Sequence, residues 1–383
     1  MLRNIRLLYL HNFLSDFRPQ WPFAVVYFAQ ISGSYTAAMS IWALEMLSSA
    51  FMDIPTGIFS DRVGRRYTIF LGSLSAAIGV ALYALAQDIW GLLPGAFFMG
   101  LSQCLFNGNN NAMLYESLKS QNQEGRFHHY QGRTSSMWHL ALCISAFLAA
   151  VLEPFGLKFI FMVGIFPQVL AAITSLFFKE PRIHIHDGKK NFHYLLEACI
   201  AIRKNPRLWL LLLAQTISFG AGESNYQFKT AFVNMLWPGW GPGIFRGINH
   251  SVAFLGYWFS GRILDRIKAP YYLAFREAYW FITQTIAVIM SNVFTPLLML
   301  TGAFVYGPGE VAREQLLQKE FSDHQRATMA SIGSFASSLA YAGIALAIGA
   351  VADHFGLTAG VSLGIAISVM ALPFYIYLYR RHF

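Results

Sequence analysis

Long apolar segments separated by very short links constrain this chain more than any other sequence feature. A helix that crosses a membrane needs roughly 20 mostly apolar residues, and about twelve segments of the chain meet this requirement. We therefore predict an all-α membrane protein of about twelve transmembrane helices. The predicted spans lie near 5–32, 37–59, 67–87, 89–116, 130–152, 157–178, 208–236, 243–264, 271–292, 295–317, 327–351 and 357–379.

The composition agrees with a chain that is surrounded by lipid. Hydrophobic residues make up 55% of the sequence and charged residues only 12%. Soluble domains carry a charged fraction of about 25%, so a soluble fold would leave too much apolar surface in water. The net charge of +9 would fit either a nucleic-acid partner or a set of basic cytoplasmic loops.

The placement of the basic residues decides between these two interpretations. Alternate loops carry nearly all of them, for example Arg62, Arg65 and Arg66, whereas the intervening loops carry Lys158 and almost nothing else basic. Basic loops face the cytoplasm in membrane proteins. We expect both termini in the cytoplasm, a multi-pass protein of the bacterial inner membrane, the lipid bilayer as its surroundings and no nucleic-acid partner.

One link is longer than the others and divides the chain into two halves. It runs from Lys179 to Arg207 and is charged. We predict an N-terminal bundle of six helices at 1–178, a cytoplasmic linker at 179–206 and a C-terminal bundle of six helices at 207–383.

The two halves contain matching short sequences. Gly57–Arg66 matches Gly261–Lys268, and Phe155-Gly156-Leu157 matches Phe355-Gly356-Leu357. A third match, Arg6-Leu7 with Arg207-Leu208, has a similar offset of about 200 residues, as expected for parallel repeats related by an axis along the membrane normal.

The segment Gly57–Arg66 resembles the G-x-x-x-D-R-x-G-R-[RK] signature of the major facilitator superfamily, and a degenerate copy follows at 261–268. The resemblance implies two pseudo-symmetric six-helix bundles that carry a solute by alternating access. It also implies that the signature loop is a latch between the bundles. The gating residues would be Gly57, Asp61, Arg62, Gly64, Arg65 and Arg66, with Asp265 and Arg266 in the degenerate copy.

The chemistry of the loop fits such a role. Gly57 is small where two helices could approach closely, and Gly64 permits a tight turn. Asp61 can accept hydrogen bonds from a helix N-terminus or from an arginine. The alternative is an ordinary basic cytoplasmic loop with an incidental aspartate.

Charged and amide side chains inside the spans are costly, so they usually face a cavity or a partner. The resemblance implies that helices 1, 4, 7 and 10 line the cavity, and these residues concentrate on those helices. The candidates for substrate and proton binding are Asp16, Arg18, Gln20, Glu45, Asn107, Asn110, Glu223, Asn225, Lys229, Tyr306, Glu310 and Arg313.

Helix 1 is expected to bend. Pro19 and Pro22 remove backbone donors and should kink the helix. Helical spacing would place Asp16 and Gln20 on one face, and Asp16 and Arg18 on different faces.

Asp16, Glu223 and Glu310 are the candidate proton carriers, because desolvation favours a neutral carboxyl group and a nearby cation favours the ionised form. Arg18, Lys229 or Arg313 could supply such cations or bind an anionic substrate group. Other roles stay open for three candidates: Arg313 in a structural salt bridge, Glu45 against the partner bundle, and Lys229 reaching outward.

We predict a secondary active transporter for a small polar, charged or zwitterionic solute, driven by protons and monomeric. The sequence has no nucleotide-binding loop, no metal or cofactor pattern, and no convergent catalytic set that would indicate an enzyme. Alternatives on the same fold are a drug or amphiphile exporter, a lipid flippase and a non-transporting sensor. The stretch Cys104–Gly108 lacks the helix-4 arginine typical of proton-coupled drug antiporters.

Overall fold

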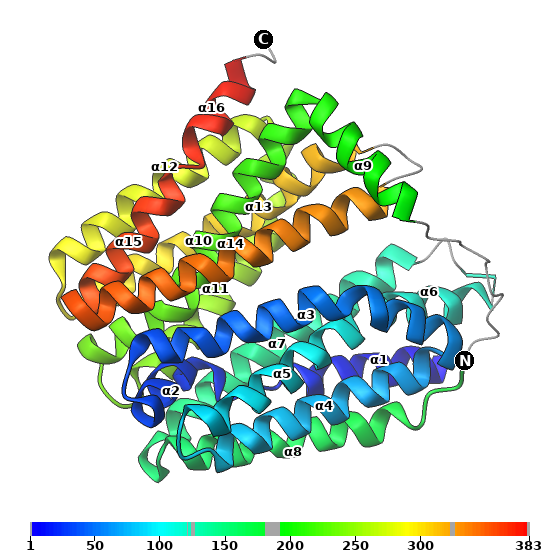
Figure 1. Cartoon of the computed structure of the whole chain (residues 1–383), viewed down its shortest axis with the longest axis horizontal. Helices are drawn as coiled ribbons and strands as arrows, with labels where there is room; N and C mark the ends of the chain where they lie inside the picture. The colour runs from blue at the N-terminus through cyan, green and yellow to red at the C-terminus, as the bar shows by residue number, and fades with distance from the viewer. Residues whose placement is uncertain (1, 121, 124–126, 181–191, 322–325, 381–383) are drawn as a thin grey trace. The chain divides into compact units, whose positions relative to one another are not determined.

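The computed structural model describes residues 2–120, 122–123, 127–180, 192–321 and 326–380, in which every regular element is a helix (Figure 1). The first half contains α1 (Leu2–Ser15), η1 (Trp21–Phe23), α2 (Ala24–Ser32), α3 (Tyr35–Val63), α4 (Arg65–Leu85), α5 (Ile89–Phe106), α6 (Asn109–Lys119), α7 (Phe127–Leu152), η3 (Glu153–Phe155) and α8 (Leu157–Ser175). The second half contains α9 (Phe192–Lys204), α10 (Pro206–Leu236), α11 (Gly241–Leu264), α12 (Ala269–Met290), α13 (Thr295–Glu320), α14 (Arg326–Phe355), α15 (Leu357–Val369) and α16 (Leu372–Arg380).

Each predicted span corresponds to between one and three of these helices. By length and composition, six helical stretches of the described residues could cross a membrane: Arg65–Leu85, Ile89–Lys119, Tyr130–Phe155, Leu157–Ser175, Thr328–Phe355 and Leu357–Leu378. The predicted spans outside this group include 5–32, 208–236 and 295–317, which carry most of the candidate charged residues.

The chain forms two compact units. Unit 1 comprises Met1–Gly33, Leu44–Asp187 and Gly239–Gly247, and unit 2 comprises Ser34–Ala43, Gly188–Pro238 and Ile248–Phe383. Helices α3 and α11 therefore begin in one unit and continue in the other. The predicted linker at 179–206 contains α9, and its residues 181–191 lie outside the described part of the chain.

Local sequence signals explain where several helices begin. The Asp88 carboxylate accepts a hydrogen bond from the Gly91 amide (2.9 Å) and caps the start of α5. Asn205 caps α10 by accepting from the amides of Arg207 and Leu208, and Pro206 occupies the first helical position, where no amide donor is needed. Such caps make short links between long helices possible.

The repeated Phe-Gly-Leu sequences adopt the same backbone conformation in both halves. Gly156 has φ 95° and ψ 150° before α8, and Gly356 has φ 86° and ψ 166° before α15. These positive φ angles are accessible to glycine and strained for other residues. The internal repeat predicted from the sequence is therefore present in the structure.

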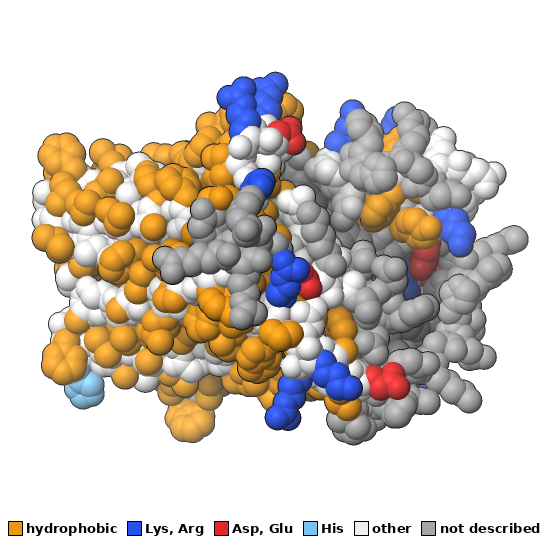
Figure 2. All heavy atoms as spheres, turned by 90° about the horizontal axis from the view of Figure 1, so that it is seen from above, with side chains coloured by type: hydrophobic (Ala, Val, Ile, Leu, Met, Phe, Trp, Pro, Cys, Tyr) orange, Lys and Arg blue, Asp and Glu red, His pale blue; other side chains and the backbone are white. Residues whose placement is uncertain are grey.

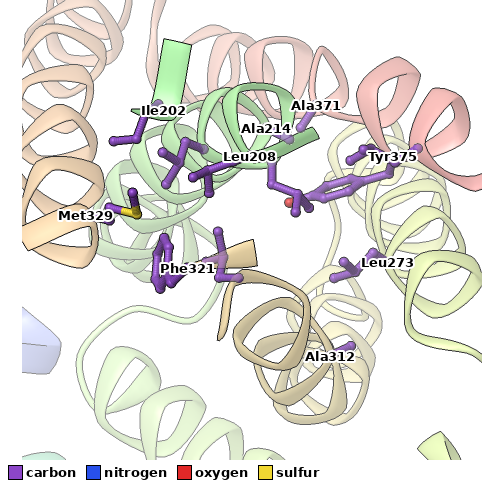
Figure 3. Packing of buried hydrophobic residues seen from close by; sticks show 13 residues of the cluster. Ile202, Leu208, Ala214, Leu273, Ala312, Phe321, Met329, Ala371 and Tyr375 are labelled. Atoms are coloured by element: carbon purple, nitrogen blue, oxygen red, sulfur yellow. The ribbon is translucent and has the colours of Figure 1, made fainter. Parts of the chain in front are cut away.

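Each unit has its own hydrophobic core. In unit 2, buried side chains from α9, α10, α12, α13, α14 and α16 meet around Leu208, Leu273 and Tyr375 (Figure 3). In unit 1, Ile5 and Leu8 of α1 pack with Ile69 of α4 and Met113 of α6. The sequence separation of these partners shows that each core joins helices that are far apart along the chain.

Apolar side chains also cover much of the outer surface. Figure 2 shows a broad field of hydrophobic side chains on the left of the view, with Lys and Arg side chains towards its centre and right. Large residues such as Trp90, Trp258 and Ile289 are 74%, 71% and 78% exposed. A surface of this kind is suited to lipid contact.

Candidate functional site

The first predicted span is interrupted in its middle. Helix α1 ends at Ser15 and the next helical residue is Trp21, so Asp16 to Gln20 are not helical. The kink predicted from Pro19 and Pro22 is confirmed, and it is a complete break. Because helical spacing does not hold across a break, the expectation that Asp16 and Arg18 point to different sides is wrong, and the shared face of Asp16 and Gln20 does not exist.

Arg18 is the centre of this break. Its Nε donates to the Ser15 carbonyl oxygen (2.7 Å), its Nη2 lies 3.8 Å from Asp16 Oδ1, and its guanidinium lies 4.6 Å from the Trp21 ring centroid. The guanidinium is buried and also interacts electrostatically with the Glu45 carboxylate of α3. The predicted site residues Asp16, Arg18 and Glu45 thus interact within unit 1, where the two carboxylates have the Arg18 guanidinium in common.

Gln20 lies on the other side of the break, against α8. It is only 1% exposed, and neither its amide nitrogen nor its amide oxygen has a hydrogen-bond partner in the described part of the chain. Its side chain abuts Gly164, where a Cβ atom would collide with it. Unit 2 repeats this arrangement, because Asn225 abuts Gly364 and its Oδ1 also has no partner among the described residues.

The fourth predicted span is interrupted as well. Helix α5 ends at Phe106 and α6 starts at Asn109, with Gly108 between them at φ 75°. Asn107 Nδ2 donates to Asp53 Oδ1 (3.0 Å), which joins the break to α3. The Oδ1 atom of Asn110 is buried and has no partner in the described residues. The apolar pattern predicted one continuous helix here, although the Asn107-Gly108 pair is a turn signal.

The signature loop is held by a hydrogen-bond network around Arg65. Gly64 has φ 99°, which confirms the tight turn between α3 and α4. Arg65 Nη1 donates to Ser60 Oγ (2.8 Å) and Asn109 Oδ1 (3.0 Å), and Ser60 itself donates to Asn109 Oδ1. Arg65 Nε lies 3.5 Å from Glu116 Oε1. Arg65 therefore connects the end of α3 to α6.

Glu180 is a partner of this loop that the sequence analysis missed. Its two carboxylate oxygens accept from the backbone amides of Arg65 (2.7 Å) and Arg66 (2.8 Å), so it caps α4. The side chain of Asn4 in α1 binds the backbone of the preceding residue, Lys179. Asn4 Nδ2 donates to the Lys179 carbonyl oxygen (2.8 Å), and Asn4 Oδ1 accepts from the Lys179 amide (3.0 Å). Spacing alone could not reveal a cap supplied from 115 residues further along the chain.

The other gating candidates make few contacts in the described structure. A Cβ atom built on Gly57 would meet no atom within 4 Å, so the close helix approach expected there is not seen. The Asp61 side chain lies outside the described part, and Arg62 is exposed. Asp265 and Arg266 follow the end of α11 and are exposed, without an ion pair among the described residues.

Unit 2 contains a buried network of four charged residues. Arg276 Nη2 lies 2.5 Å from Glu277 Oε1, and Arg276 Nη1 lies 3.1 Å from Glu310 Oε1. Arg313 Nη2 lies 2.5 Å from Glu310 Oε2. Ser218 of α10 also donates to Glu277 (2.8 Å) and accepts from Arg276 (3.0 Å). The network joins α10, α12 and α13, and its charges balance.

Glu310 and Arg313 were predicted as site residues from the sequence, whereas Arg276 and Glu277 were not. Two adjacent charges inside the apolar span 271–292 were the available signal. Gly309 makes room for the network, because a Cβ atom at this position would collide with the Arg276 side chain.

The remaining candidates of unit 2 are distributed along α10 and α13. Gln227 Nε2 donates to Glu223 Oε1 (2.7 Å), and Asn225 Nδ2 donates to the Val361 carbonyl oxygen (3.2 Å). The Lys229 ammonium lies 5.5 Å from the centroid of the Trp280 ring. Tyr306 is exposed, and its ring meets Tyr257 edge to face. Tyr306 also interacts electrostatically with Glu310 and with Glu223.

Comparison with known proteins identifies the family. The sequence profile of the Major Facilitator Superfamily matches residues 12–341. The chain belongs to this superfamily. It is accordingly an integral membrane protein, in agreement with its apolar helices.

Curated relatives are similar over part of the chain. The Multidrug resistance protein MdtG of Citrobacter koseri is 26% identical over 232 residues, which cover 56% of this chain and 53% of MdtG. An uncharacterized transporter of Buchnera aphidicola is 28% identical over 137 residues, 34% of this chain and 33% of that protein. The matched region thus spans about half the length of MdtG and about a third of the Buchnera transporter.

Solved structures share the fold over nearly the whole chain. A mutant of the nucleoside transporter NupG superposes with a TM-score of 0.84 at 13% identity, and the alignment covers 98% of this chain and 100% of that one. A POT family transporter superposes with a TM-score of 0.78 at 14% identity, covering 98% and 95%. At these identities the likeness establishes the superfamily fold and leaves the substrate open.

Proposed function

We propose that this chain is a secondary active transporter that moves a small solute across the membrane by alternating access and is coupled to protons. Membership of the superfamily supports the transport activity. The names of proteins with a similar fold, a nucleoside transporter and a POT family transporter, agree with it.

The charge balance at the break in helix 1 carries the proposal of proton coupling. Asp16 and Glu45 share one guanidinium, that of Arg18, so one carboxylate is left without a cation in the described part of unit 1. An uncompensated charge inside a membrane costs about 2.5–3.5 kcal/mol on insertion scales. A proton, or a cationic group of the solute, would neutralise it. Interrupted helices are also where transporters build substrate and ion sites.

Glu310 is less suited to carry the proton than the sequence alone suggests. Its Oε1 lies 3.1 Å from the Arg276 guanidinium and its Oε2 lies 2.5 Å from that of Arg313, so both carboxylate oxygens are already engaged. We assign the Arg276, Glu277, Glu310 and Arg313 network a structural role. Asp16 and Glu45 become the principal proton carriers, and Glu223 stays a candidate.

The solute that fits the mixed charges is small and polar, charged or zwitterionic.

The Arg65 network supports a gating role for the signature loop, because it connects the loop to α6 through Asn109 and Glu116. From the distribution of basic residues we propose that both termini face the cytoplasm of a bacterium. We also propose that the protein is a monomer.

Export of drugs or amphiphiles is the second candidate function. The similarity to MdtG, a multidrug resistance protein, favours it. The absence of the helix-4 arginine in Cys104–Gly108 argues against the proton-coupled antiporter branch.

Transport in whole cells tests the proposal. Cells that express the chain are given isotope-labelled amino acids, dipeptides and nucleosides, together with the fluorescent cation ethidium, with and without a protonophore. We expect protonophore-sensitive movement of at least one probe and a loss of at least tenfold in the Asp16→Asn/Glu45→Gln double variant. The control Glu314→Gln, at an exposed carboxylate bonded to Gln318, should transport normally.

The outcomes separate the alternatives. Movement of ethidium alone would favour drug export over transport of a polar solute. Transport at an unchanged rate in the presence of the protonophore would contradict proton coupling. A double variant that transports at the wild-type rate would contradict coupling through Asp16 and Glu45.

A further inference from the structure

The break in helix 1 leaves the Ser15 carbonyl group without its usual helical partner. In a continuous helix this oxygen would accept a hydrogen bond from the amide of residue 19, but Pro19 has no amide hydrogen. Two side chains take over. Arg18 Nε donates to the Ser15 carbonyl oxygen (2.7 Å), and Gln168 Nε2 of α8 donates to the same atom (3.2 Å). A carbonyl oxygen has two lone pairs, so both bonds can form together.

The same turn of α8 also contacts the far end of the break. Gly164 lies four residues before Gln168, which places both on one face of α8. A Cβ atom at Gly164 would collide with the Gln20 side chain, so Gln20 packs directly against this face. One turn of α8 therefore holds the segment that contains Arg18 at both of its ends.

The Gln168 side chain is not what packing alone would favour at this position. It is 1% exposed, and its Oε1 has no hydrogen-bond partner in the described part of the chain. A buried polar atom without a partner lowers stability, and an apolar side chain of the same length would avoid this cost. The bond from Gln168 Nε2 to Ser15 thus points to a role other than filling space.

We propose that Gln168 is a positioning residue for the Arg18 guanidinium. The bond between Arg18 and Ser15 is local, so by itself it cannot fix the pair relative to the rest of unit 1. The bond from Gln168 attaches the pair to α8 and keeps the guanidinium beside Asp16, at 3.8 Å. The inference rests on the proposed function in that Arg18 is there the cation shared by the proton carriers.

Hydrogen exchange in the purified full-length chain tests this attachment. Gln168→Met keeps the length of the side chain and removes the donor. The amides of Phe17 and Trp21 close turns within and directly after the break, and we expect them to exchange roughly tenfold faster in this variant. The melting temperature should not fall, because the unpaired Oε1 is removed together with the donor.

A matched control and the cell assay extend the test. Gln87→Met, at an exposed glutamine of unit 1, should leave exchange and transport unchanged. Gln168→Met should reduce protonophore-sensitive transport at least fivefold. Arg18→Lys keeps the charge but lacks the guanidinium Nε, and in this background Gln168→Met should have little further effect, because residues that act through one another are not additive.

The possible results separate positioning from stability. Unchanged exchange at Phe17 and Trp21 in Gln168→Met would overturn the proposal. Faster exchange throughout unit 1 with a lower melting temperature would overturn it as well, because it indicates a purely structural role. Wild-type transport despite faster exchange at the break would show that the position of Arg18 does not matter for function.

The proposed function can fail independently of this inference. If Asp16→Asn/Glu45→Gln transports at the wild-type rate, proton coupling through these carboxylates is contradicted. A local change in exchange in Gln168→Met would still support the attachment of Arg18 to α8, because exchange is measured without solute or a proton gradient.

Discussion

Arg276 contacts two carboxylates and one hydroxyl of the unit 2 network. It bonds to Glu277 and Ser218, and it shares Glu310 with Arg313. Burying a charge is costly, and removing one partner of a buried pair leaves the other charge uncompensated. Replacing both partners by apolar residues avoids this penalty. The network therefore predicts opposite effects for single and double substitutions.

Arg276→Met should lower the free energy of unfolding by about 3–5 kcal/mol, because Glu277 is left buried without its cation. The double variant Arg276→Met/Glu277→Leu should recover a large part of this loss. Chemical unfolding in mixed detergent measures both. Arg203→Met, at an exposed arginine of α9, serves as the control and should change little. A double variant no more stable than the single one would contradict a network held by charge compensation.

The sequence identified half of this network and none of its pairing. Glu310 and Arg313 were predicted because they are charged residues in a helix expected to line the cavity. Arg276 and Glu277 lie in a different predicted span, and no spacing rule connects positions on two helices. Packing in three dimensions decides which buried charges meet.

At the scale of helices, the sequence predicted the positions well and the interruptions only in part. Pro19 and Pro22 indicated the break in helix 1, since proline removes a backbone donor. The break at Asn107 and Gly108 was missed, because one glycine inside an apolar segment is also compatible with a continuous helix. Both breaks leave buried amide oxygens without partners in the described residues, at Gln20 and Asn110. Tertiary contacts decide these details.

The first turn of α3 is held within unit 2 by Asp353 of α14. The carboxylate accepts from the amides of Tyr35 (2.7 Å) and Thr36 (2.9 Å) and from the hydroxyls of Ser34 and Thr36 (both 2.6 Å). A carboxylate at a helix N-terminus satisfies donors that have no partner inside the helix. Gly349, one turn earlier on α14, packs against the backbone of Thr36.

Asp353→Ala should lower the free energy of unfolding by about 1 kcal/mol, the usual cost of losing an N-cap. Hydrogen exchange at the amides of Tyr35 and Thr36 should become faster, and Asp353→Asn should have a smaller effect. Asp265→Ala, at an exposed carboxylate without an ion pair in the described residues, is the control for losing an acid. Unchanged exchange at both amides in Asp353→Ala would show that the carboxylate does not stabilise this turn.

At the scale of the whole molecule, the repeat predicted from short sequence matches is visible in the backbone of Gly156 and Gly356 and in the glycine contacts of Gln20 and Asn225. The two units nevertheless differ in charge. The cluster of unit 1 has an excess of carboxylate at the break of helix 1, whereas the network of unit 2 is balanced. A sequence repeat predicts the shared architecture but not this difference, which depends on a few substituted side chains.

The central claim is that solute movement is coupled to protons through Asp16 and Glu45. The most direct measurement records the pH inside liposomes that contain the purified chain and a trapped pH-sensitive dye, while a probe transported in the cell assay is added outside. The account predicts a change in internal pH that depends on the solute and disappears in Asp16→Asn/Glu45→Gln. A transported solute that leaves the internal pH unchanged would contradict it.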